Sequence, residues 1–283
     1  MKNVRIQKAD KLGLCFGVRR AITLLKEAAR EYGEIETLGP LAHNRLLVET
    51  LANLGIKPIT HLDQAGGRIL AITTHGVSPS VLAEIKARHI RIIDTTCPIV
   101  RKAQDAAKEL AEAGFDVFIF GDAMHSEVKG LLGWAGDKGI AALDINETYK
   151  SGKSPSRLGI VSQTTQTQSD FINFAKQLMD MFGPKIDEIR LVNTLCKVTQ
   201  GHQEAALRLA RKSQVMIVIG GANSANTTHL VGICFPLVET HLVETADEVD
   251  TSWFVGKDHI GITAGASTPD EAVEELMDRL RSL

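Results

Sequence analysis

Short apolar runs alternate with longer amphipathic segments along almost the whole chain. The runs Val117–Gly121 and Val215–Gly220 are rich in β-branched, aromatic or other apolar residues, which is typical of strands buried in a parallel sheet. In Ile99–Leu110, apolar residues recur at the spacing of one helix face. Strands that alternate with helices in this way predict the α/β class, with mostly parallel sheets.

The predicted elements repeat three times. A cysteine stands between a predicted strand and a predicted helix at Cys15, Cys97 and Cys196. Another apolar run ends 28 residues after each cysteine, at His43, His125 and Ser224. A third junction in each repeat carries His75, Thr164 and Ser267. This is an internal repeat of roughly 90 residues.

The repeat predicts three similar α/β lobes arranged as a pseudo-threefold trefoil. Residues 1–96 would form the first lobe, 97–193 the second, and 194–283 the third together with a C-terminal helix. Ligands of open parallel sheets bind beyond the carboxyl ends of the strands, and all nine junction residues fall at such ends. We therefore expect the junctions to face one shared centre.

Three local predictions are less regular. Val4–Gln7 is expected to be a weak strand of the first repeat, and Lys129–Gly133 to lie near a glycine-rich helix start in the second. Asn146–Arg157 is the most loop-like stretch of the chain.

Composition narrows the class of protein. A net charge of −2 offers no basic field for nucleic acid or an acidic membrane, and no apolar run approaches the roughly 18 residues of a membrane span. The first residues lack the apolar core of a secretory signal. Four cysteines in such a chain are expected to be reduced thiols, and the compartment to be cytoplasmic.

The three repeated cysteines predict a metal centre. Each precedes a helix N-terminus, where the helix dipole stabilises a thiolate. Three thiolates can hold an iron–sulfur cluster with one iron left open, or contribute to a zinc site. Zinc sites usually draw on close C-x₂-C pairs, which are absent here, so the cluster is favoured. Cys234 has no counterpart in the other repeats and is expected to be a small buried hydrophobe.

The other junctions predict an anion site with an acid beside it. His43, His75 and His125 occupy matched junctions, whereas the remaining histidines do not and are expected to be structural or exposed: His61, His89, His202, His229, His241 and His259. The segment 223–227, with Ser224, Ala225 and Asn226, offers backbone N–H groups and short polar side chains to an anion, although Ser224 could merely cap a helix.

Ser267 invites the same two interpretations. No Walker lysine or G-x-G-x-x-G motif is present, so a small phosphorylated or diphosphorylated ligand fits better than a nucleotide. Glu127 is the one carboxylate expected near this centre and is a candidate proton donor.

The motifs together resemble those of the 4-hydroxy-3-methylbut-2-enyl diphosphate reductases, the LytB family. They are, in chain order, CFGVRRAI, GPLAHN, THGVSP, DTTCPIV, GDAMHSEV, SQTT, NTLCKVT, GGANSANT and TAGAS. The resemblance implies a trefoil of three lobes around a four-iron, four-sulfur (4Fe-4S) cluster with Cys15, Cys97 and Cys196 as ligands. The open iron would take the substrate's hydroxyl oxygen.

The resemblance also implies roles for the remaining junction residues. His43, His75, Ser224, Asn226 and Ser267 would hold the diphosphate, with Ala225 offering its backbone N–H. His125 would lie beside the substrate, Glu127 would deliver protons, and Thr164 would share its hydrogen bonds.

The implied reaction is the reductive dehydroxylation of an allylic diphosphate to isopentenyl and dimethylallyl diphosphate. An external carrier such as ferredoxin or flavodoxin would supply the electrons. Three positions depart from the family's usual pattern: Ala225 stands in place of a second serine, His202 in place of a common arginine, and Leu14 in place of a common phenylalanine.

Two other functions are compatible with the residues. An iron–sulfur hydro-lyase also uses an open iron but needs no electrons, and an iron–sulfur sensor would only report redox state. Glu127, Thr164 and the anion cradle disfavour the sensor, because a sensor needs no substrate pocket.

Overall fold

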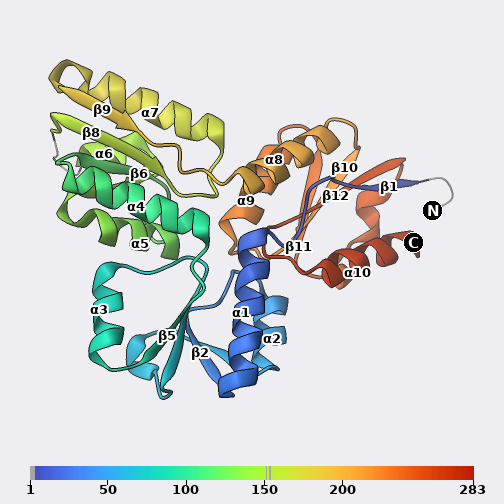
Figure 1. Cartoon of the computed structure of the whole chain (residues 1–283). Coiled ribbons are helices and arrows are strands. Elements are labelled where there is room, and N and C mark those ends of the chain that lie inside the picture. Colours follow the sequence, from blue (N-terminus) through green and yellow to red (C-terminus); the bar gives the residue numbers. More distant parts are fainter. Residues whose placement is uncertain (1–3, 151, 153) are drawn as a thin grey trace.

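The computed structural model describes residues 4–150, 152 and 154–283, and these form three lobes around a common centre (Figure 1). Each lobe contains one four-stranded sheet in which all the paired strands are parallel. The predicted fold class, three α/β lobes with parallel sheets, is confirmed.

The first lobe has the strand order β3-β2-β4-β5. Its strands are β2 (Ile35–Leu38), β3 (Ile56–Ile59), β4 (Ile69–Ile72) and β5 (Arg91–Asp94). Its helices are α1 (Phe16–Tyr32), α2 (Arg45–Ala52) and α3 (Pro79–Ala87). The central strand β4 buries three of its four residues and β2 two of its four, while α1 and α2 contribute fully or nearly fully buried leucines such as Leu25 and Leu47.

The second lobe has the order β7-β6-β8-β9. Its strands are β6 (Asp116–Phe120), β7 (Gly139–Ala142), β8 (Arg157–Ser162) and β9 (Glu188–Leu191). Its helices are α4 (Pro98–Glu112), α5 (Ser126–Ala135), α6 (Ile145–Lys150) and α7 (Gln168–Phe182). Alternate residues of β6 pack into two separate hydrophobic clusters, because helices cover both faces of the sheet.

The third lobe has the order β1-β12-β10-β11. Its strands are β1 (Arg5–Lys8), β10 (Val215–Ile219), β11 (Glu239–Val243) and β12 (His259–Ala264). Its helices are α8 (Lys197–Ala210), α9 (Ala225–Cys234) and α10 (Asp270–Arg281). No helix in the described ranges is long and apolar enough to cross a membrane.

The first strand belongs to the third lobe and not to the first. β1 pairs with β12, from Arg5 opposite His259 to Lys8 opposite Ile262. The prediction that residues 1–96 form one lobe is therefore wrong at its beginning. The strand before each cysteine is an edge strand of the preceding lobe's sheet. β5 before Cys97 belongs to the first lobe, β9 before Cys196 to the second, and β1 before Cys15 to the third. The repeat is thus circular, and β1 joins the two ends of the chain.

Two local predictions also need correction. α5 begins at Ser126, earlier than the expected start near Lys129. The glycines that suggested a start there serve close packing instead, since a Cβ on Gly133 would lie 2.2 Å from the Cβ of Ser78. The expected loop 146–157 contains most of α6, which is anchored by Ile145 against the core, while residues 151 and 153 lie outside the described part.

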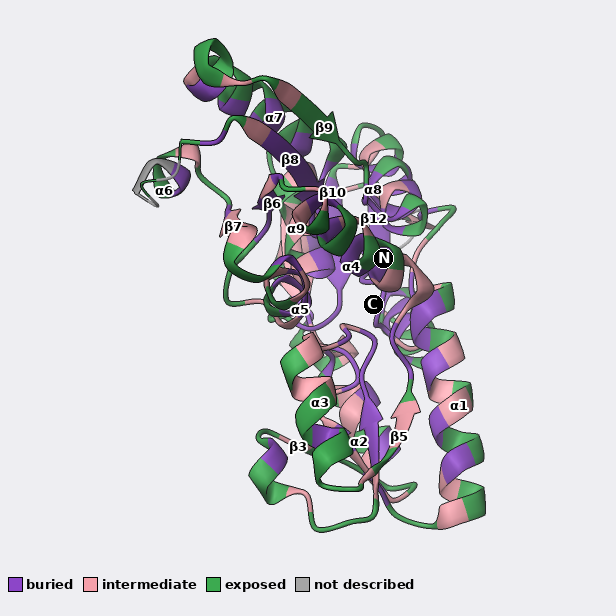
Figure 2. Cartoon of the chain, turned by 60° about the vertical axis from the view of Figure 1, so that its left-hand side comes forward, coloured by how far each residue is buried: buried purple, intermediate pink, exposed green. Residues whose placement is uncertain are grey.

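This topology explains why the junction residues meet. The chain reverses its direction of winding between β2 and β4, between β6 and β8, and between β10 and β12. Such switch points open a crevice at the carboxyl ends of the strands. The histidine, threonine and serine junctions all follow these central strands, whereas the cysteines follow the edge strands. Figure 2 shows that the buried residues gather towards the middle of the molecule, where the lobes meet.

Candidate functional site

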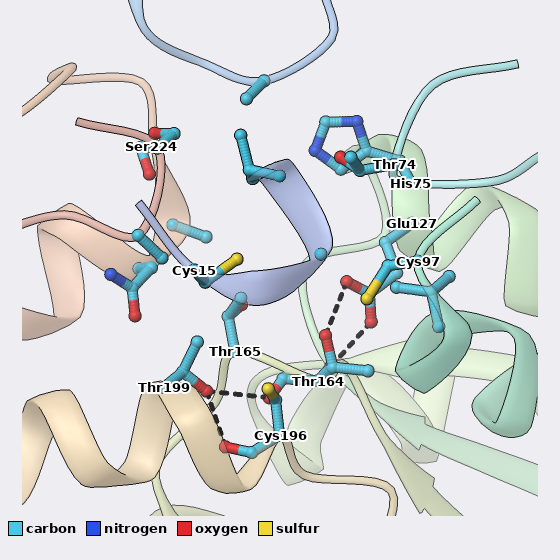
Figure 3. Close-up of a pocket in the computed structure, with 18 of the residues that line it drawn as sticks. Cys15, Thr74, His75, Cys97, Glu127, Thr164, Thr165, Cys196, Thr199 and Ser224 are labelled. Carbon is cyan, nitrogen blue, oxygen red and sulfur yellow. Dashed lines mark hydrogen bonds between the residues drawn. The ribbon is translucent and has the colours of Figure 1, made fainter. Parts of the chain in front are cut away.

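One pocket at the centre collects every predicted site residue. Its lining includes Cys15, Cys97, Cys196, His43, His75, His125, Glu127, Thr164, Ser224, Ala225, Asn226 and Ser267 (Figure 3 shows much of it). All three lobes contribute. Each contribution comes from the turn that follows a strand, from a residue directly before a helix, or from the first turn of a helix.

The three cysteines stand at equivalent helix ends. Cys15, Cys97 and Cys196 are the residues directly before α1, α4 and α8, and none uses its sulfur as a helix cap. All three thiols are free. Burial raises the pKa of Cys15 and of Cys97, and the neighbouring sulfurs raise it further, while backbone N–H groups of the following helix turn oppose this. A buried thiolate at these positions needs a nearby cation to compensate its negative charge, and a bound metal ion provides that cation.

The space around the sulfurs suits a cluster. The α1 backbone comes so close at Gly17 that a Cβ there would lie 2.7 Å from the Cys97 sulfur and 3.9 Å from that of Cys15. The equivalent positions in the other repeats carry Ile99 and Val198, so a side chain is excluded only at Gly17. The absence of a side chain at Gly17 leaves room for a group bound by the cysteine sulfurs. The residues here fit a bound iron–sulfur cluster.

Gly17→Ala should weaken cluster loading. The added Cβ would displace the Cys97 sulfur. A free thiol can rotate away from the Cβ, but a thiolate that ligates a cluster cannot. We expect iron content and visible absorbance after anaerobic reconstitution to fall markedly, with the thermal unfolding of the metal-free protein little changed. Gly232→Ala is the matched control, because Gly232 lies in α9 with nothing within 4 Å of its Cβ position. Normal iron loading of the Gly17 variant would contradict the hypothesis that Gly17 leaves room for the cluster.

Three histidines form a compact group beside the sulfurs. The ring centroids of His43 and His75 lie 5.0 Å apart, and His125 lies 5.5 Å and 5.4 Å from them. Burial lowers the pKa of all three, well below the usual range for His75 and to about 4 for His125. The rings are therefore neutral at pH 7, and each offers one donor and one acceptor.

Several polar atoms of the pocket have no partner. The buried Nε2 of His43, both side-chain polar atoms of Asn226 and the hydroxyl of Ser267 make no hydrogen bond within the described chain. Buried polar groups are nearly always satisfied, so an unpartnered set that converges on one pocket indicates a polar ligand. One ring nitrogen of each of His43, His75 and His125 lies within 4.8 Å of the others, a spacing that could also suit a metal ion. The adjoining amide and hydroxyls favour an anion.

Ser224 has the capping role that its sequence position allowed. It is the N-cap of α9, and its hydroxyl accepts from the Thr227 N–H at 3.5 Å. The first turn of α9 nevertheless faces the pocket through Ala225 and Asn226. A helix N-terminus with free amide and hydroxyl groups beside it can bind an anion, so the two interpretations coexist.

Glu127 is the one carboxylate among the lining residues, and it is 2% exposed. Its two oxygens accept from the Thr164 backbone N–H at 2.6 Å and from the Thr164 hydroxyl at 2.9 Å (Figure 3). Burial raises the pKa of Glu127 to about 7, although both hydrogen bonds oppose the rise. A carboxyl group with a pKa near neutrality can hold and release a proton at physiological pH.

Contacts between lobes hold the Thr164 segment in place, and these were not predicted. The Thr164 carbonyl accepts from the Cys196 N–H at 2.8 Å, and the next carbonyl, of Thr165, accepts from Gln203 at 3.2 Å. His229 of α9 also contacts the Thr165 carbonyl through Nδ1 at 2.9 Å. Gln203 and His229 lie far along the chain from Thr165, and no local motif marks them. Glu127 is thereby positioned by the second and third lobes together.

Three residues that we expected to have no part in the site, Cys234, His202 and His229, do not line the pocket. Cys234 is fully buried in the core of the third lobe, and burial raises the pKa of its thiol to about 11. His202 is buried on α8 and does not line the pocket. His229 is half-buried and structural, although it acts close to the site.

Comparisons with known proteins agree on one family. The model of the family "LytB protein" matches residues 6–281. The 4-hydroxy-3-methylbut-2-enyl diphosphate reductase of Dehalococcoides mccartyi is 45% identical over 280 residues, which are 98% of this chain and 99% of the relative. The enzyme of that name from Geobacter sulfurreducens is 38% identical over 279 residues, 98% of this chain and 97% of the relative.

Two solved structures are similar over almost the whole chain. One is described as (E)-4-hydroxy-3-methyl-but-2-enyl diphosphate reductase, the terminal enzyme of the non-mevalonate pathway; it is 36% identical, with a TM-score of 0.72 over 99% of this chain and 100% of that chain. The other, E-1-hydroxy-2-methyl-but-2-enyl-4-diphosphate reductase from Plasmodium falciparum, is 26% identical, with a TM-score of 0.91 over 98% and 87%.

Proposed function

The chain belongs to the LytB family of 4-hydroxy-3-methylbut-2-enyl diphosphate reductases, and we propose a role in that reaction for each part of its central pocket. The protein is an oxidoreductase of the non-mevalonate isoprenoid pathway. It replaces the substrate's hydroxyl group by hydrogen, so that one carbon–oxygen bond breaks and one carbon–hydrogen bond forms. Two electrons and two protons enter, and the products are water with isopentenyl or dimethylallyl diphosphate.

One observation carries the assignment of the site. Three free thiols, a set of unpartnered polar side chains and a single buried acid converge on one pocket. The reaction needs a redox centre, a diphosphate site and a proton source, and these three groups of residues correspond to them in turn.

Cys15, Cys97 and Cys196 would hold the family's iron–sulfur centre, as a 4Fe-4S cluster with one iron not ligated by protein. When bound, such a cluster supplies single electrons and a Lewis-acidic iron. The sulfurs come from three lobes, so binding of the cluster would also fasten the lobes together. Three free thiols suit a reducing compartment, and a cytoplasmic location is part of the proposal.

The diphosphate would lie among His43, His75, Ser224, Asn226 and Ser267. The unpartnered groups of His43, Asn226 and Ser267 can donate to phosphate oxygens, His75 and the Ser224 hydroxyl line the same pocket, and the α9 N-terminus adds backbone N–H groups, including that of Ala225. Ala225 lacks the second hydroxyl that the family pattern led us to expect, so backbone donors must supply more of the contact. His125 would lie beside the allyl group.

Glu127 would deliver protons. It lines the same pocket as Cys97, and burial of that thiol raises its pKa, with the charge of Glu127 as a smaller contribution in the same direction. Thr164 holds both carboxyl oxygens and so fixes the direction in which the acid points. Each turnover consumes protons at this point, and Glu127 regains them by titrating near neutral pH.

The electrons must come from an external donor, for which we propose ferredoxin or flavodoxin. No other redox group is implied by the residues of the pocket. The test of the function is anaerobic turnover of 4-hydroxy-3-methylbut-2-enyl diphosphate by the iron-loaded protein, with dithionite-reduced methyl viologen as donor. Formation of both allylic and homoallylic diphosphate products with consumption of two electrons is expected. Conversion without reductant would instead identify a hydro-lyase, and iron loading without conversion a sensor.

Diphosphate binding should take up protons. Burial lowers the pKa of the three histidines, so that they are neutral at pH 7, and a nearby anion raises it again. We expect uptake of about one proton at pH 7, and a dissociation constant that increases up to about tenfold per pH unit between pH 6 and 8. Calorimetric titration with inorganic diphosphate in buffers of different ionisation enthalpy measures this. Binding with no proton uptake would show that the histidines stay neutral and only donate hydrogen bonds.

A further inference from the structure

We propose that the protein face around the first turns of α1, α4 and α8 docks an acidic one-electron carrier protein, through a basic rim and the exposed ring of Phe16. We call this surface the electron-entry face and define it by Lys11, Phe16, Arg20, Lys102, Lys197 and Val198. The inference rests on the proposed function, because a partner that brings electrons is needed only if the pocket carries out a reduction.

The three helices begin next to the cysteines and run outwards from the centre (Figure 1). Phe16, Pro98 and Lys197 each come directly after a cysteine, so the pseudo-threefold arrangement places them around one end of the pocket. The residues proposed to bind substrate follow the central strands and line the same pocket. The rate of electron transfer falls steeply with distance. A carrier that contacts these helix ends touches the residues directly next to the proposed cluster ligands.

Apolar side chains are exposed where the chain has no structural need for them. The ring of Phe16 is 62% exposed, although Phe16 is the residue next to Cys15, and Val198, two residues after Cys196, is 39% exposed. Aromatic residues are enriched at the cores of protein interfaces, where they contribute much of the binding energy. One exposed phenylalanine on a small face suits a weak, transient partner of the kind that exchanges electrons.

The charge around Phe16 is mostly positive. Lys11, Lys102 and Lys197 are exposed and Arg20 is half-buried, and none of the four pairs with a carboxylate within 4 Å among the described residues. By contrast, Arg19 and Arg101 of the same helix turns are neutralised by Asp270 and Asp94. The whole chain has a net charge of −2, so these free cations are a local feature. They complement an acidic partner and exclude a basic one.

Two contacts fix basic side chains against the segments around the cysteines. Arg20 of α1 donates to the carbonyl of Thr96, the residue before Cys97. Lys11, which precedes Cys15, packs along Gly201 of α8, with its Nζ 3.4 Å from the position of a Cβ there. Lys11 is thus held against α8, and Arg20 against the segment that leads into α4.

The test compares two pairs of charge reversals in the iron-loaded protein. Lys102→Glu with Lys197→Glu changes the electron-entry face, and neither residue has a role in the pocket. Lys176→Glu with Lys185→Glu is the matched control, since both lysines are exposed on α7 or the turn η3 (Gly183–Lys185) after it, on the outer part of the second lobe. The probe is an acidic ferredoxin, and both its dissociation constant and its KM in turnover are measured at several ionic strengths.

We expect the dissociation constant and the KM for ferredoxin to rise at least about tenfold in the electron-entry variant, with a weaker dependence on salt. The control pair should behave like the wild type. Turnover with methyl viologen should stay within about twofold for all proteins, because a small donor needs no docking surface.

Unchanged ferredoxin binding in the electron-entry variant, or an equal loss in the control pair, would overturn the docking proposal. A parallel loss with methyl viologen would overturn it too, because it would place the two lysines in the pocket's own function. Absence of methyl viologen turnover in the wild type would instead refute the proposed reaction, while leaving the measured ferredoxin binding to be judged separately.

Discussion

Replacing Cys15, Cys97 or Cys196 by serine should abolish cluster loading, whereas Cys234→Ser should leave it intact. The first three cysteines line the pocket at equivalent helix ends, and Cys234 is a fully buried core residue. Serine is close in size to cysteine, but its hydroxyl is a poor ligand for iron and is not deprotonated at neutral pH. Iron and sulfide content after anaerobic reconstitution, with visible absorbance, is the measurement.

The four variants control one another. Each removes one thiol, so a general effect of mutation or of handling would lower iron in all of them. Turnover should fall below detection in the three pocket variants and stay near the wild-type rate in Cys234→Ser, provided that the core tolerates the hydroxyl. A separate melting curve of the metal-free protein checks that tolerance. Full iron content in any pocket variant would remove that cysteine from the ligand set.

The fold class could be predicted because its signals are local. Apolar periodicity depends on neighbouring residues alone, and each cysteine is marked by the strand and helix patterns on either side of it. Because the same pattern recurs three times, the junction residues could be assigned to the correct strand ends. The sheet to which β1 belongs could not be predicted in the same way. Its partner β12 is more than 250 residues away, and a strand of four residues carries no mark of its neighbour.

The sequence indicated which residues line the central pocket, but not how their surroundings change their pKa values. The motifs indicated Glu127 and Thr164, but the pKa of about 7 depends on how completely the packed structure excludes water from one carboxyl group. Similarly, Gln203 and His229 belong to other helices, and only the packed structure shows that they hold the Thr165 carbonyl. Contacts between lobes follow from tertiary packing, which no short pattern encodes.

Glu127→Gln should lower kcat by about 10²–10⁴-fold while iron loading and diphosphate binding remain. Glutamine is nearly isosteric: its carbonyl can accept from the Thr164 N–H, and its amide can donate to the Thr164 hydroxyl, so the geometry is kept. What it cannot do is release a proton. Steady-state turnover with methyl viologen separates this loss from electron delivery by a partner, and KM should change little because the carboxyl group is not part of the diphosphate site.

The pH dependence gives a second readout of the same group. The pKa of Glu127 is raised to about 7 by burial, so the acid is protonated below that pH and kcat of the wild type should decline above it. Folding must show the linked effect. The folded protein holds this proton where the unfolded chain, with a pKa of 4.5, has lost it, so stability of the metal-free protein falls as pH rises from about 4.5 to about 7.

Because glutamine does not titrate, the variant should lack this loss of stability and gain up to roughly 3 kcal/mol relative to the wild type between pH 5 and pH 8. The histidines titrate identically in both proteins and cancel in the comparison. Chemical unfolding at both pH values measures the difference. A wild-type rate in the fully loaded variant would exclude Glu127 as the proton donor. A rate loss without the stability difference would show that its carboxyl group titrates outside the range in which a donor is useful.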